Sequence, residues 1–437
     1  MSRFTFVGLL FCCVLAGSPT AYGTGTTGYY QAWAATGWND RQDYATVMQL
    51  GPQGNVYLGG RSNDVYGLPD DQPDGGVAAS FDSSGNHRWL SKAYPEDGLD
   101  HVLGLAVDAS GSVYISGETY RYAAGAEAFL VKFSADGSRL WERHLGSPDN
   151  EFGRGVAVDS SGNVYVTGST TGLVGSTDYR GYDAYVAKYS SSGERLWTEQ
   201  FDDEFANFGD DLAIGGGDQL YLSGSGQGAT LASLSLDGDV LWKRSPNYSE
   251  IAGRTTSISS TAADADGFVY TAGSTNQLYD NARGFVEGDL FVTKHAPDGD
   301  MVWQTVIAGP GVDGATDVAV DSSGKVYFAG YSNGGAGGSV RSEIDARWGV
   351  LSPTGDLLLD ETYGTERNDA ATGIDVDEFG RVYLAGSTSW SVGRYFAAEA
   401  DVFLVRFDPI PEPTTQLLAS LFCLGSALRH RALPWRA

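Results

Sequence analysis

Short apolar segments alternate with glycine-centred turns along most of the chain. The segment Gly155–Gly168 contains two apolar runs separated by Ser160–Gly162, which predicts two strands joined by a hairpin. A third run, Asp183–Tyr189, is followed by the turn Ser190–Gly193 and by a fourth run that opens at Glu194–Trp197. The pattern therefore predicts four short antiparallel strands and hardly any helix.

The same unit returns seven times. Each copy has a tyrosine followed three residues later by a glycine, and these tyrosines are Tyr57, Tyr114, Tyr165, Tyr221, Tyr270, Tyr327 and Tyr383. Subtracting neighbouring numbers gives intervals of 57, 51, 56, 49, 57 and 56 residues. One four-stranded propeller blade with some loop insertion has this length, so the repeat predicts an all-β propeller of seven antiparallel blades.

The N-terminal and C-terminal ends of the repeat region each contain part of one repeat. A fourth-strand tryptophan lies four residues beyond the second hairpin glycine in five repeats, at Trp89, Trp141, Trp197, Trp242 and Trp303, and Leu359 takes its place in the sixth. The seventh repeat stops at Asp401–Asp408 without a fourth strand, whereas Tyr29–Trp33 resembles an orphaned one. We expect the N-terminal strand to complete the last blade, since closing the ring removes exposed sheet edges.

The repeated segments at 156–168 and 318–330 resemble the SBBP family of bacterial seven-bladed β-propeller repeats. The resemblance covers roughly residues 29–408, and it implies a propeller domain over 24–409. Repeat four departs most from the pattern, because Leu212–Tyr221 lacks the hairpin aspartate. A distorted fourth blade is therefore expected.

Residues 1–23 have the pattern of a secretory signal peptide. Arg3 precedes an apolar run over 7–16, and Ala21–Gly23 forms a small-x-small cleavage site. The predicted mature domain, 24–409, contains no cysteine, so a disulfide or a thiolate metal site is not expected there.

The C-terminal segment 410–437 is similar to a PEP-CTERM sorting signal. It contains Pro411, Glu412 and Pro413, then an apolar stretch over 417–428, then the basic cluster 429–431. The resemblance implies an exosortase as partner, transient anchoring in the inner membrane, and delivery to the envelope, surface or extracellular matrix of a Gram-negative-type bacterium that makes exopolysaccharide. The apolar stretch is shorter than the roughly 20 residues of a full span.

The net charge is −27, which disfavours binding to nucleic acid or anionic lipid headgroups. The hydrophobic fraction of 42% is ample for a folded core, so the acidic excess does not indicate disorder.

An acidic register lies eight residues before the position of the hairpin aspartate. It comprises Asp43, Asp100, Glu151, Asp313 and Asp369, with Asn207 and Thr256 in repeats four and five. If the next strand is the innermost of its blade, these side chains form a crown at one mouth of the channel. Such a crown could bind a divalent cation such as calcium, or a sugar. Alternatively, each acid caps backbone amides between blades.

Other repeated residues have structural interpretations. The hairpin aspartates Asp108, Asp159, Asp264, Asp321 and Asp377 are expected to accept hydrogen bonds from turn amides, and the repeated tyrosines and tryptophans to pack between blades. The third strands pair an acid with a base five residues later, at Glu127 and Lys132, Asp183 and Lys188, Asp289 and Lys294, and Asp401 and Arg406. Because the two members face opposite sides of a strand, we expect their partners on neighbouring strands or blades.

The five histidines share no register, and no nucleophile-plus-base motif is present. Asp100–His101 is the only acid of the register that is followed by a histidine. We therefore predict a secreted, non-catalytic scaffold or adhesion module, without a cofactor. The alternative is a carbohydrate-binding or carbohydrate-active propeller, such as a lyase, a hydrolase or a quinone-dependent enzyme, which would need one blade with an irregular polar cluster.

Overall fold

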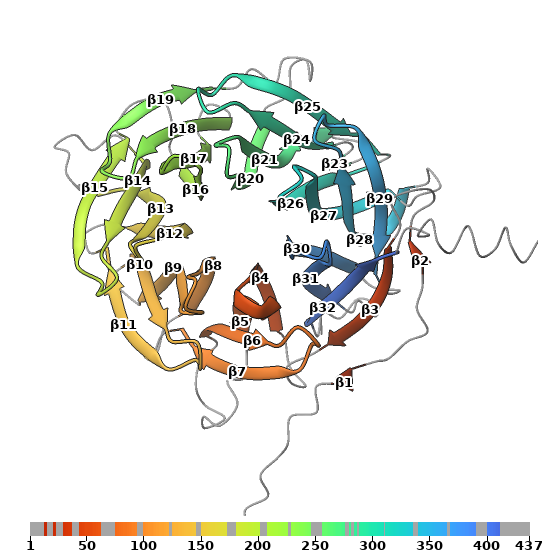
Figure 1. Ribbon diagram of the computed structural model, residues 1–437, viewed down its shortest axis with the longest axis horizontal. Coiled ribbons are helices and arrows are strands. Elements are labelled where there is room, and N and C mark those ends of the chain that lie inside the picture. Colours follow the sequence, from red (N-terminus) through yellow and green to blue (C-terminus); the bar gives the residue numbers. More distant parts are fainter. Residues whose placement is uncertain are drawn as a thin grey trace, which may run out of the picture.

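Seven four-stranded antiparallel sheets surround a central channel (Figure 1), which confirms the predicted seven-bladed propeller. The computed structural model describes residues 13–14, 21–22, 29–36, 43–62, 75–93, 99–121, 125–145, 150–172, 181–201, 208–225, 229–245, 256–275, 279–280, 284–285, 288–309, 311–334, 340–364, 368–389 and 400–410. The sorting motif 411–413 and most of the predicted leader 1–23 lie outside these ranges. Within them, no helix is long and apolar enough to cross a membrane.

The blades follow one another in chain order, each from its innermost to its outermost strand. Blade 1 is β4 (Asp43–Leu50), β5 (Val56–Ser62), β6 (Gly75–Phe81) and β7 (His87–Lys92); blade 2 is β8 (Leu99–Val107), β9 (Val113–Arg121), β10 (Gly125–Phe133) and β11 (Arg139–His144). Blade 3 is β12 (Glu151–Val158), β13 (Val164–Thr170), β14 (Asp183–Tyr189) and β15 (Arg195–Phe201); blade 4 is β16 (Phe208–Gly215), β17 (Gln219–Ser225), β18 (Ala229–Ser235) and β19 (Val240–Arg244).

The second half of the ring repeats this arrangement. Blade 5 is β20 (Thr256–Ala263), β21 (Val269–Thr275), β24 (Leu290–His295) and β25 (Met301–Ile307); blade 6 is β26 (Asp313–Val320), β27 (Val326–Gly334), β28 (Val340–Leu351) and β29 (Leu357–Tyr363). Blade 7 is β30 (Asn368–Val376), β31 (Val382–Ser389), β32 (Ala400–Pro409) and β3 (Tyr29–Thr36). A two-stranded hairpin, β22 (Tyr279–Asp280) with β23 (Gly284–Phe285), is inserted in the chain between β21 and β24 of blade 5.

The N-terminal strand closes the ring, as the sequence predicts. β3 pairs antiparallel with β32 and places Trp33 opposite Arg406. This is the register in which Trp141 lies opposite Lys132 in blade 2 and Trp197 opposite Lys188 in blade 3. Two further two-residue strands, β1 (Cys13–Val14) and β2 (Ala21–Tyr22), pair with the outer side of β3.

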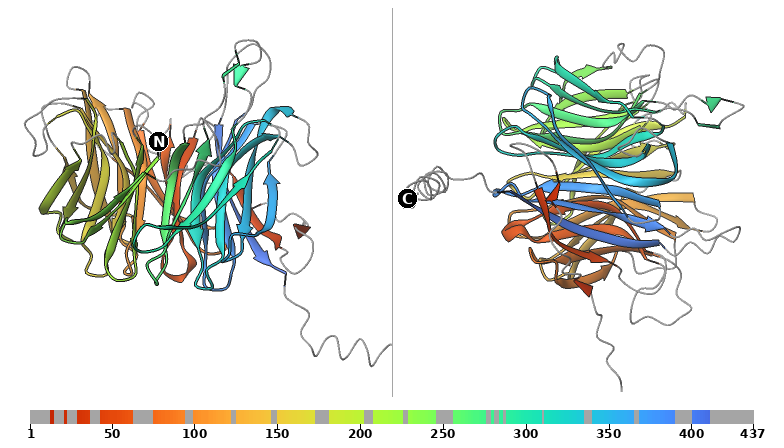
Figure 2. Two further views of the ribbon diagram at one scale, coloured as in Figure 1. Left: turned by 90° about the horizontal axis from the view of Figure 1, so that it is seen from above. Right: turned by 90° about the vertical axis from the view of Figure 1, so that its right-hand side faces the viewer.

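The disc has two different faces (Figure 2). We call the face at which every innermost strand begins the start face. The opposite side, where short turns join the first strand to the second and the third to the fourth, is the turn face. Since the third strand runs parallel to the first, both turns of a blade lie on this face.

Adjacent blades are held together by apolar burial. One cluster joins Tyr57 and Ala78 of blade 1 to Val102, Leu105 and Phe129 of blade 2. All seven repeated tyrosines are at most 1% exposed. The interpretation of these tyrosines as packing residues is confirmed.

Each repeated tyrosine is tied to the turn aspartate of its own blade where that aspartate is present. In blade 3, one carboxylate oxygen of Asp159 accepts hydrogen bonds from the backbone amides of Ser161 and Asn163 at 2.9 and 2.8 Å, and the other accepts one from the Tyr165 hydroxyl at 3.1 Å. The same hydroxyl-to-carboxylate bond recurs at 2.9–3.4 Å in Tyr114–Asp108, Tyr270–Asp264, Tyr327–Asp321 and Tyr383–Asp377. The turn-capping role of these aspartates is confirmed.

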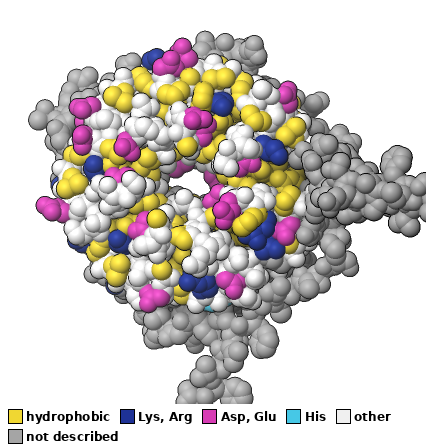
Figure 3. All heavy atoms as spheres, viewed as in Figure 1, with side chains coloured by type: hydrophobic (Ala, Val, Ile, Leu, Met, Phe, Trp, Pro, Cys, Tyr) yellow, Lys and Arg dark blue, Asp and Glu magenta, His cyan; other side chains and the backbone are white. Residues whose placement is uncertain are grey.

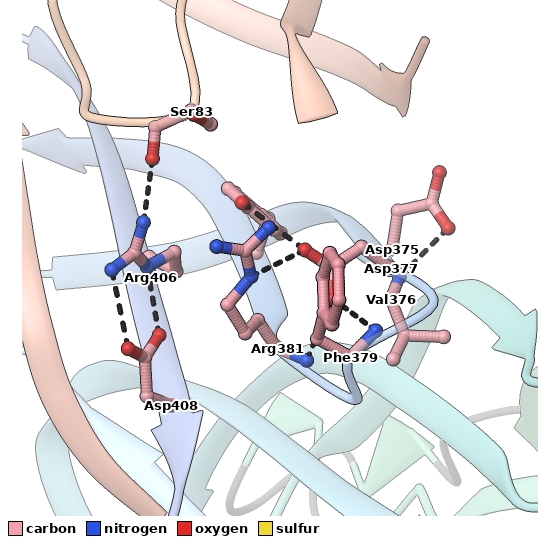
Figure 4. Close-up of polar contacts among 9 residues, drawn as sticks. Ser83, Asp375, Val376, Asp377, Phe379, Arg381, Arg406 and Asp408 are labelled. Atoms are coloured by element: carbon pink, nitrogen blue, oxygen red, sulfur yellow. Dashed lines mark hydrogen bonds and ion pairs between the residues drawn. The ribbon is translucent and has the colours of Figure 1, made fainter. Parts of the chain in front are cut away.

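Each fourth-strand tryptophan ties its blade to the next one. The indole N–H donates to a backbone carbonyl in the outer turn of the following blade at 2.8–3.3 Å, in the pairs Trp89–Ala135, Trp141–Ser191, Trp197–Leu236, Trp242–Pro297 and Trp303–Pro353. Third-strand bases also donate to carbonyls in the outer turn of the following blade: Lys188 donates to Leu236 at 2.8 Å, and Arg406 donates to Ser83 at 2.6 Å across the closure (Figure 4). The expectation that these bases find partners on a neighbouring blade is confirmed for both.

Blade 4 is not distorted, contrary to the expectation from its sequence. Its four strands pair in the same order as in the other blades. The missing aspartate is replaced by backbone geometry, because Gly217 and Asp218 both have positive φ in the turn, at 77° and 57°. The Tyr221 hydroxyl donates instead to the Gly267 carbonyl of blade 5 at 2.6 Å.

Deleting residues 24–40 should leave β32 as an unpaired edge and convert the monomer into aggregates, because an open edge strand pairs with other chains. The measurement is size-exclusion chromatography with a thermal melt. The matched control is a deletion of residues 1–23, which keeps β3 and should remain monomeric. A stable, monomeric 24–40 deletion would contradict ring closure by β3.

Candidate functional site

The five predicted carboxyls of the acidic register lie at the start face and are buried. Asp43, Glu151 and Asp313 are the first residues of β4, β12 and β26, and Asp100 and Asp369 are the second residues of β8 and β30. All five are at most 2% exposed. Asn207, the corresponding residue of repeat four, lies outside the described residues.

Each of these acids faces a hydroxyl residue on the second strand of its own blade. The five cross-strand pairs are Asp43–Ser62, Asp100–Thr119, Glu151–Thr170, Asp313–Ser332 and Asp369–Thr388. The Thr170 hydroxyl donates to Glu151 at 3.3 Å, and Arg347 lies 3.1 Å from Asp313. Burial raises the pKa of Asp100 to about 6 and also raises the pKa of Asp313.

The structure does not gather these acids into one ligand set. Among the described residues, no three His, Cys, Asp or Glu side chains come close enough to hold a metal ion. A Cβ added to Gly364, at the end of blade 6, would lie 2.8 Å from a carboxylate oxygen of Asp369, so that acid lies against the neighbouring blade. His101, which follows Asp100, lies 3.3 Å from Glu118.

A different register is aimed at the channel mouth. All seven innermost strands shift their pairing register at the third residue beyond the acidic position, which marks a β-bulge; in blade 3 the shift also includes the next residue, Gly155. Bulges release a residue from the ladder and redirect its side chain. The residues at the bulges are Thr46, Leu103, Arg154, Asp210, Ser259, Thr316 and Thr372.

These bulge residues differ around the ring. In blades 1 and 6, Thr46 and Thr316 donate to the carbonyls of Val102 and Ala371 in the next blade at 2.5 and 2.8 Å. In blades 2 to 5, the bulge residues line a cavity of about 430 Å³ together with Phe208, Ser225, Ser257 and Ile258. Figure 3 shows the opposite, turn face of the disc, where acidic side chains lie around the other opening of the channel.

An ion pair between two blades forms the polar centre of this cavity. Arg154 of blade 3 and Asp210 of blade 4 lie 3.2 Å apart, with side chains 44% and 11% exposed. The second oxygen of Asp210 accepts a hydrogen bond from Ser225 at 2.7 Å, and burial raises the pKa of Asp210. The site therefore offers guanidinium donors beside a fixed carboxylate.

A row of aromatic rings runs beside the cavity. We define the aromatic row as Tyr120, Phe152, Tyr182 and Phe208, whose successive ring centroids are 6.5, 5.9 and 5.2 Å apart. Tyr120 and Tyr182 are 41% and 39% exposed. Phe208 also lines the cavity, so the row leads from blade 2 into the polar centre.

The bore of the channel holds a second group of carboxyls. The middle of the innermost strands encloses about 370 Å³, and Asp211, Asp317 and Asp375 line it. Asp211 accepts from the amide of Thr261 in blade 5, Asp317 from Ile374 in blade 7, and Asp375 from Leu50 in blade 1, each at 2.8 Å. Each carboxylate therefore joins two innermost strands.

The sequence contains a signal for the residues at the channel mouth, but a search for residues shared by all repeats does not detect it. Residues shared by all repeats identified the blades, whereas Arg154 and Asp210 stand where other repeats have Thr, Leu or Ser. Aligning the seven repeats and asking where one position changes chemical class would have selected them. The position of the bulge itself has no such signal.

Comparisons with known proteins identify a family that these repeats match. The profile of a PQQ-type repeat family described as "Outer membrane protein assembly factor BamB" matches residues 126–361. The regulatory protein FlaEY of Caulobacter vibrioides is 24% identical over 363 residues, covering 76% of this chain, and the chain spans about a third (33%) of that relative. Puromycin hydrolase has 14% identity and a TM-score of 0.48 over 80% of this chain and 50% of its own. Sqt1 from Chaetomium thermophilum has 11% identity and a TM-score of 0.47 over 85% of this chain and 97% of its own.

The bore aspartates should make stability depend on pH between 5 and 8. Burial raises the pKa of Asp317 to about 7 and those of Asp211 and Asp375 to about 6, from an ordinary 3.8. The folded protein then binds protons that the unfolded chain does not, so this contribution is complete below pH 3.8 and is lost as the pH rises through 6 to 7. We expect the wild-type thermal midpoint to fall more steeply from pH 5 to 8 than that of Asp317→Asn.

The wild type must be compared with the variant because the titration of His295 changes stability with pH in the opposite direction. Burial lowers its pKa to about 4, so its contribution is lost as the pH falls below 6.5. His295 is unchanged in the variant and cancels from the difference. Equal pH slopes for the wild type and for all three single Asp→Asn variants would contradict the assignment.

Proposed function

The chain belongs to the PQQ-type repeat family of the outer membrane protein assembly factor BamB, and from this premise we propose that it is a non-catalytic binding propeller that acts outside the cytoplasm. The family's description names an assembly factor, which is a role in interaction. The site that we assign to this interaction is the channel mouth at blades 2 to 5.

The observation that carries the proposal is the asymmetry of the mouth. The repeated residues have structural tasks, because the tyrosines, turn aspartates and tryptophans hold blades together. Arg154 and Asp210 depart from the repeat, and both they and the aromatic row are partly exposed. Exposed polar and aromatic groups beside a concave surface are the usual composition of a binding site.

The proposed location rests on the two ends of the sequence. Residues 1–23 have the pattern of a secretory leader, and 410–437 resemble a PEP-CTERM signal with Pro411, Glu412 and Pro413 as its motif. We propose that an exosortase processes this tail and that the mature chain, 24–409, functions at the cell surface or in the extracellular matrix. The finer resemblance to SBBP repeats agrees with a secreted scaffold.

The alternative is a carbohydrate-active enzyme at the same mouth. The specific observation in its favour is that Asp210, with its raised pKa, lies beside Arg154 where one repeat differs from the rest. Release of reducing ends from envelope polysaccharide by the wild type, abolished in Asp210→Asn, would establish this alternative in place of the binding role.

The binding role predicts that purified protein sediments with envelope material from the producing cells. Replacing the ion pair by Arg154→Ala with Asp210→Ala should weaken this binding at least about tenfold, which corresponds to about 1.4 kcal/mol, because the polar centre is lost. The matched control is the surface pair Arg139 and Glu142 of blade 2, 2.8 Å apart, each replaced by alanine. Equal binding by both double variants, with unchanged thermal midpoints, would contradict the proposal.

The sorting role predicts that replacing Pro411, Glu412 and Pro413 by alanine retains the precursor in the membrane, because the motif for processing is gone. Immunoblots of membrane and released fractions measure the change. A control with Thr414→Ala and Thr415→Ala, just beyond the motif, should be released normally. Normal release of the motif variant would count against exosortase sorting.

A further inference from the structure

We propose that the ligand of the channel mouth is an uncharged glycan chain, bound along the aromatic row and anchored at its end by Arg154 and Asp210. This inference rests on the proposed binding role and specifies the chemical class of the ligand.

The shape of the site favours a linear ligand. The four rings come from blades 2, 3 and 4, and each ring centroid lies 5.2–6.5 Å from the next, so the row is continuous over three blades. The row ends at Phe208, which lines the cavity that contains the ion pair. A chain of repeating units can contact successive rings and place one terminal unit in the cavity.

The chemistry of the site matches the two sides of a sugar ring. A pyranose has an apolar face of C–H groups, which packs on an aromatic ring, and a rim of hydroxyls, each of which donates and accepts. Arg154 offers donors, whereas Asp210 and the hydroxyl oxygen of Ser225, whose single O–H is donated to Asp210, offer acceptors. At the other end of the row, Glu118 accepts from the Tyr120 hydroxyl at 3.2 Å and adds a further acceptor.

Charge restricts the ligand to a neutral one. The protein carries a net charge of −27, which repels an acidic polysaccharide or a phosphorylated ligand. A cationic ligand would have to compete with the guanidinium of Arg154, which already pairs with the carboxylate of Asp210. An uncharged polyhydroxylated chain meets neither obstacle.

A peptide fits the same surface less well. An extended peptide that binds by strand addition needs an open sheet edge. The innermost strands are interrupted by a bulge next to the mouth, so they offer no regular ladder there. The mouth instead exposes side chains, namely the rings of the aromatic row and the Arg154–Asp210 ion pair.

The experiment measures sedimentation of the purified full-length protein with envelope material that has been treated with periodate or with proteinase K. Periodate cleaves vicinal diols and should abolish binding, whereas proteinase treatment, followed by inhibitor, should leave it intact. Loss of binding after proteinase but not after periodate would overturn the glycan and identify a protein ligand, although the binding role would stand. Absence of binding to untreated material would overturn the binding role itself.

Substitutions in the row test whether the rings carry the ligand. Phe152→Ala and Tyr182→Ala should each weaken binding at least about tenfold, and Tyr182→Phe should retain it, because the ring face remains. The matched control is Phe379→Ala, which removes a 65% exposed aromatic ring in the inner turn of blade 7, on the opposite face. Binding that depends on Arg154 and Asp210 but is unchanged in both row variants would overturn the proposed orientation and the glycan with it.

Discussion

The contact between one blade and the next is the interaction on which this ring depends. No blade can bury both of its faces alone, so each one must pack against two neighbours. At the turn face, the indole of Trp197 and the ammonium of Lys188 both donate to the Leu236 carbonyl of the following blade. Across the closure, Arg406 makes the corresponding bond to Ser83. The bond to Ser83 spans the two ends of the propeller, so closure uses the same chemistry as the other junctions.

The innermost strands of adjacent blades contact each other in two ways. Between blades 3 and 4, Gly155 allows close approach, since an added Cβ would lie 2.6 Å from the Cα of Asp211. Between blades 4 and 5 and between blades 6 and 7, Asp211 and Asp317 accept amide bonds across the junction. The junction between blades 7 and 1 combines the two, because a Cβ added to Gly373 would lie 2.6 Å from the Cβ of Met48 and Asp375 accepts a hydrogen bond from the Leu50 amide.

Sequence reasoning predicted the fold well and the site poorly, for one physical reason. A constraint that acts on every blade leaves the same residue in every repeat, as with Tyr165 and Asp159, and repetition is easy to detect. The acidic register is also repeated, and the structure places its members, such as Asp43 and Asp100, buried at the starts of the innermost strands. The mouth depends on Arg154 and Asp210, which are distinctive because they are not repeated. Their convergence required knowledge of where the bulge lies.

The bulge has a consequence for how such a ring can change over time. Because the bulge residue is released from the ladder, its side chain can vary without disturbing the strand pairing around it: threonine, leucine, arginine, aspartate and serine all occupy it here. Seven equivalent positions thus surround one opening: Thr46 and Thr316 bond to the next blade, whereas Arg154 and Asp210 take no part in the repeated contacts between blades. Gene duplication of a blade supplies the frame, and single substitutions at these positions can then give each descendant a different recognition surface.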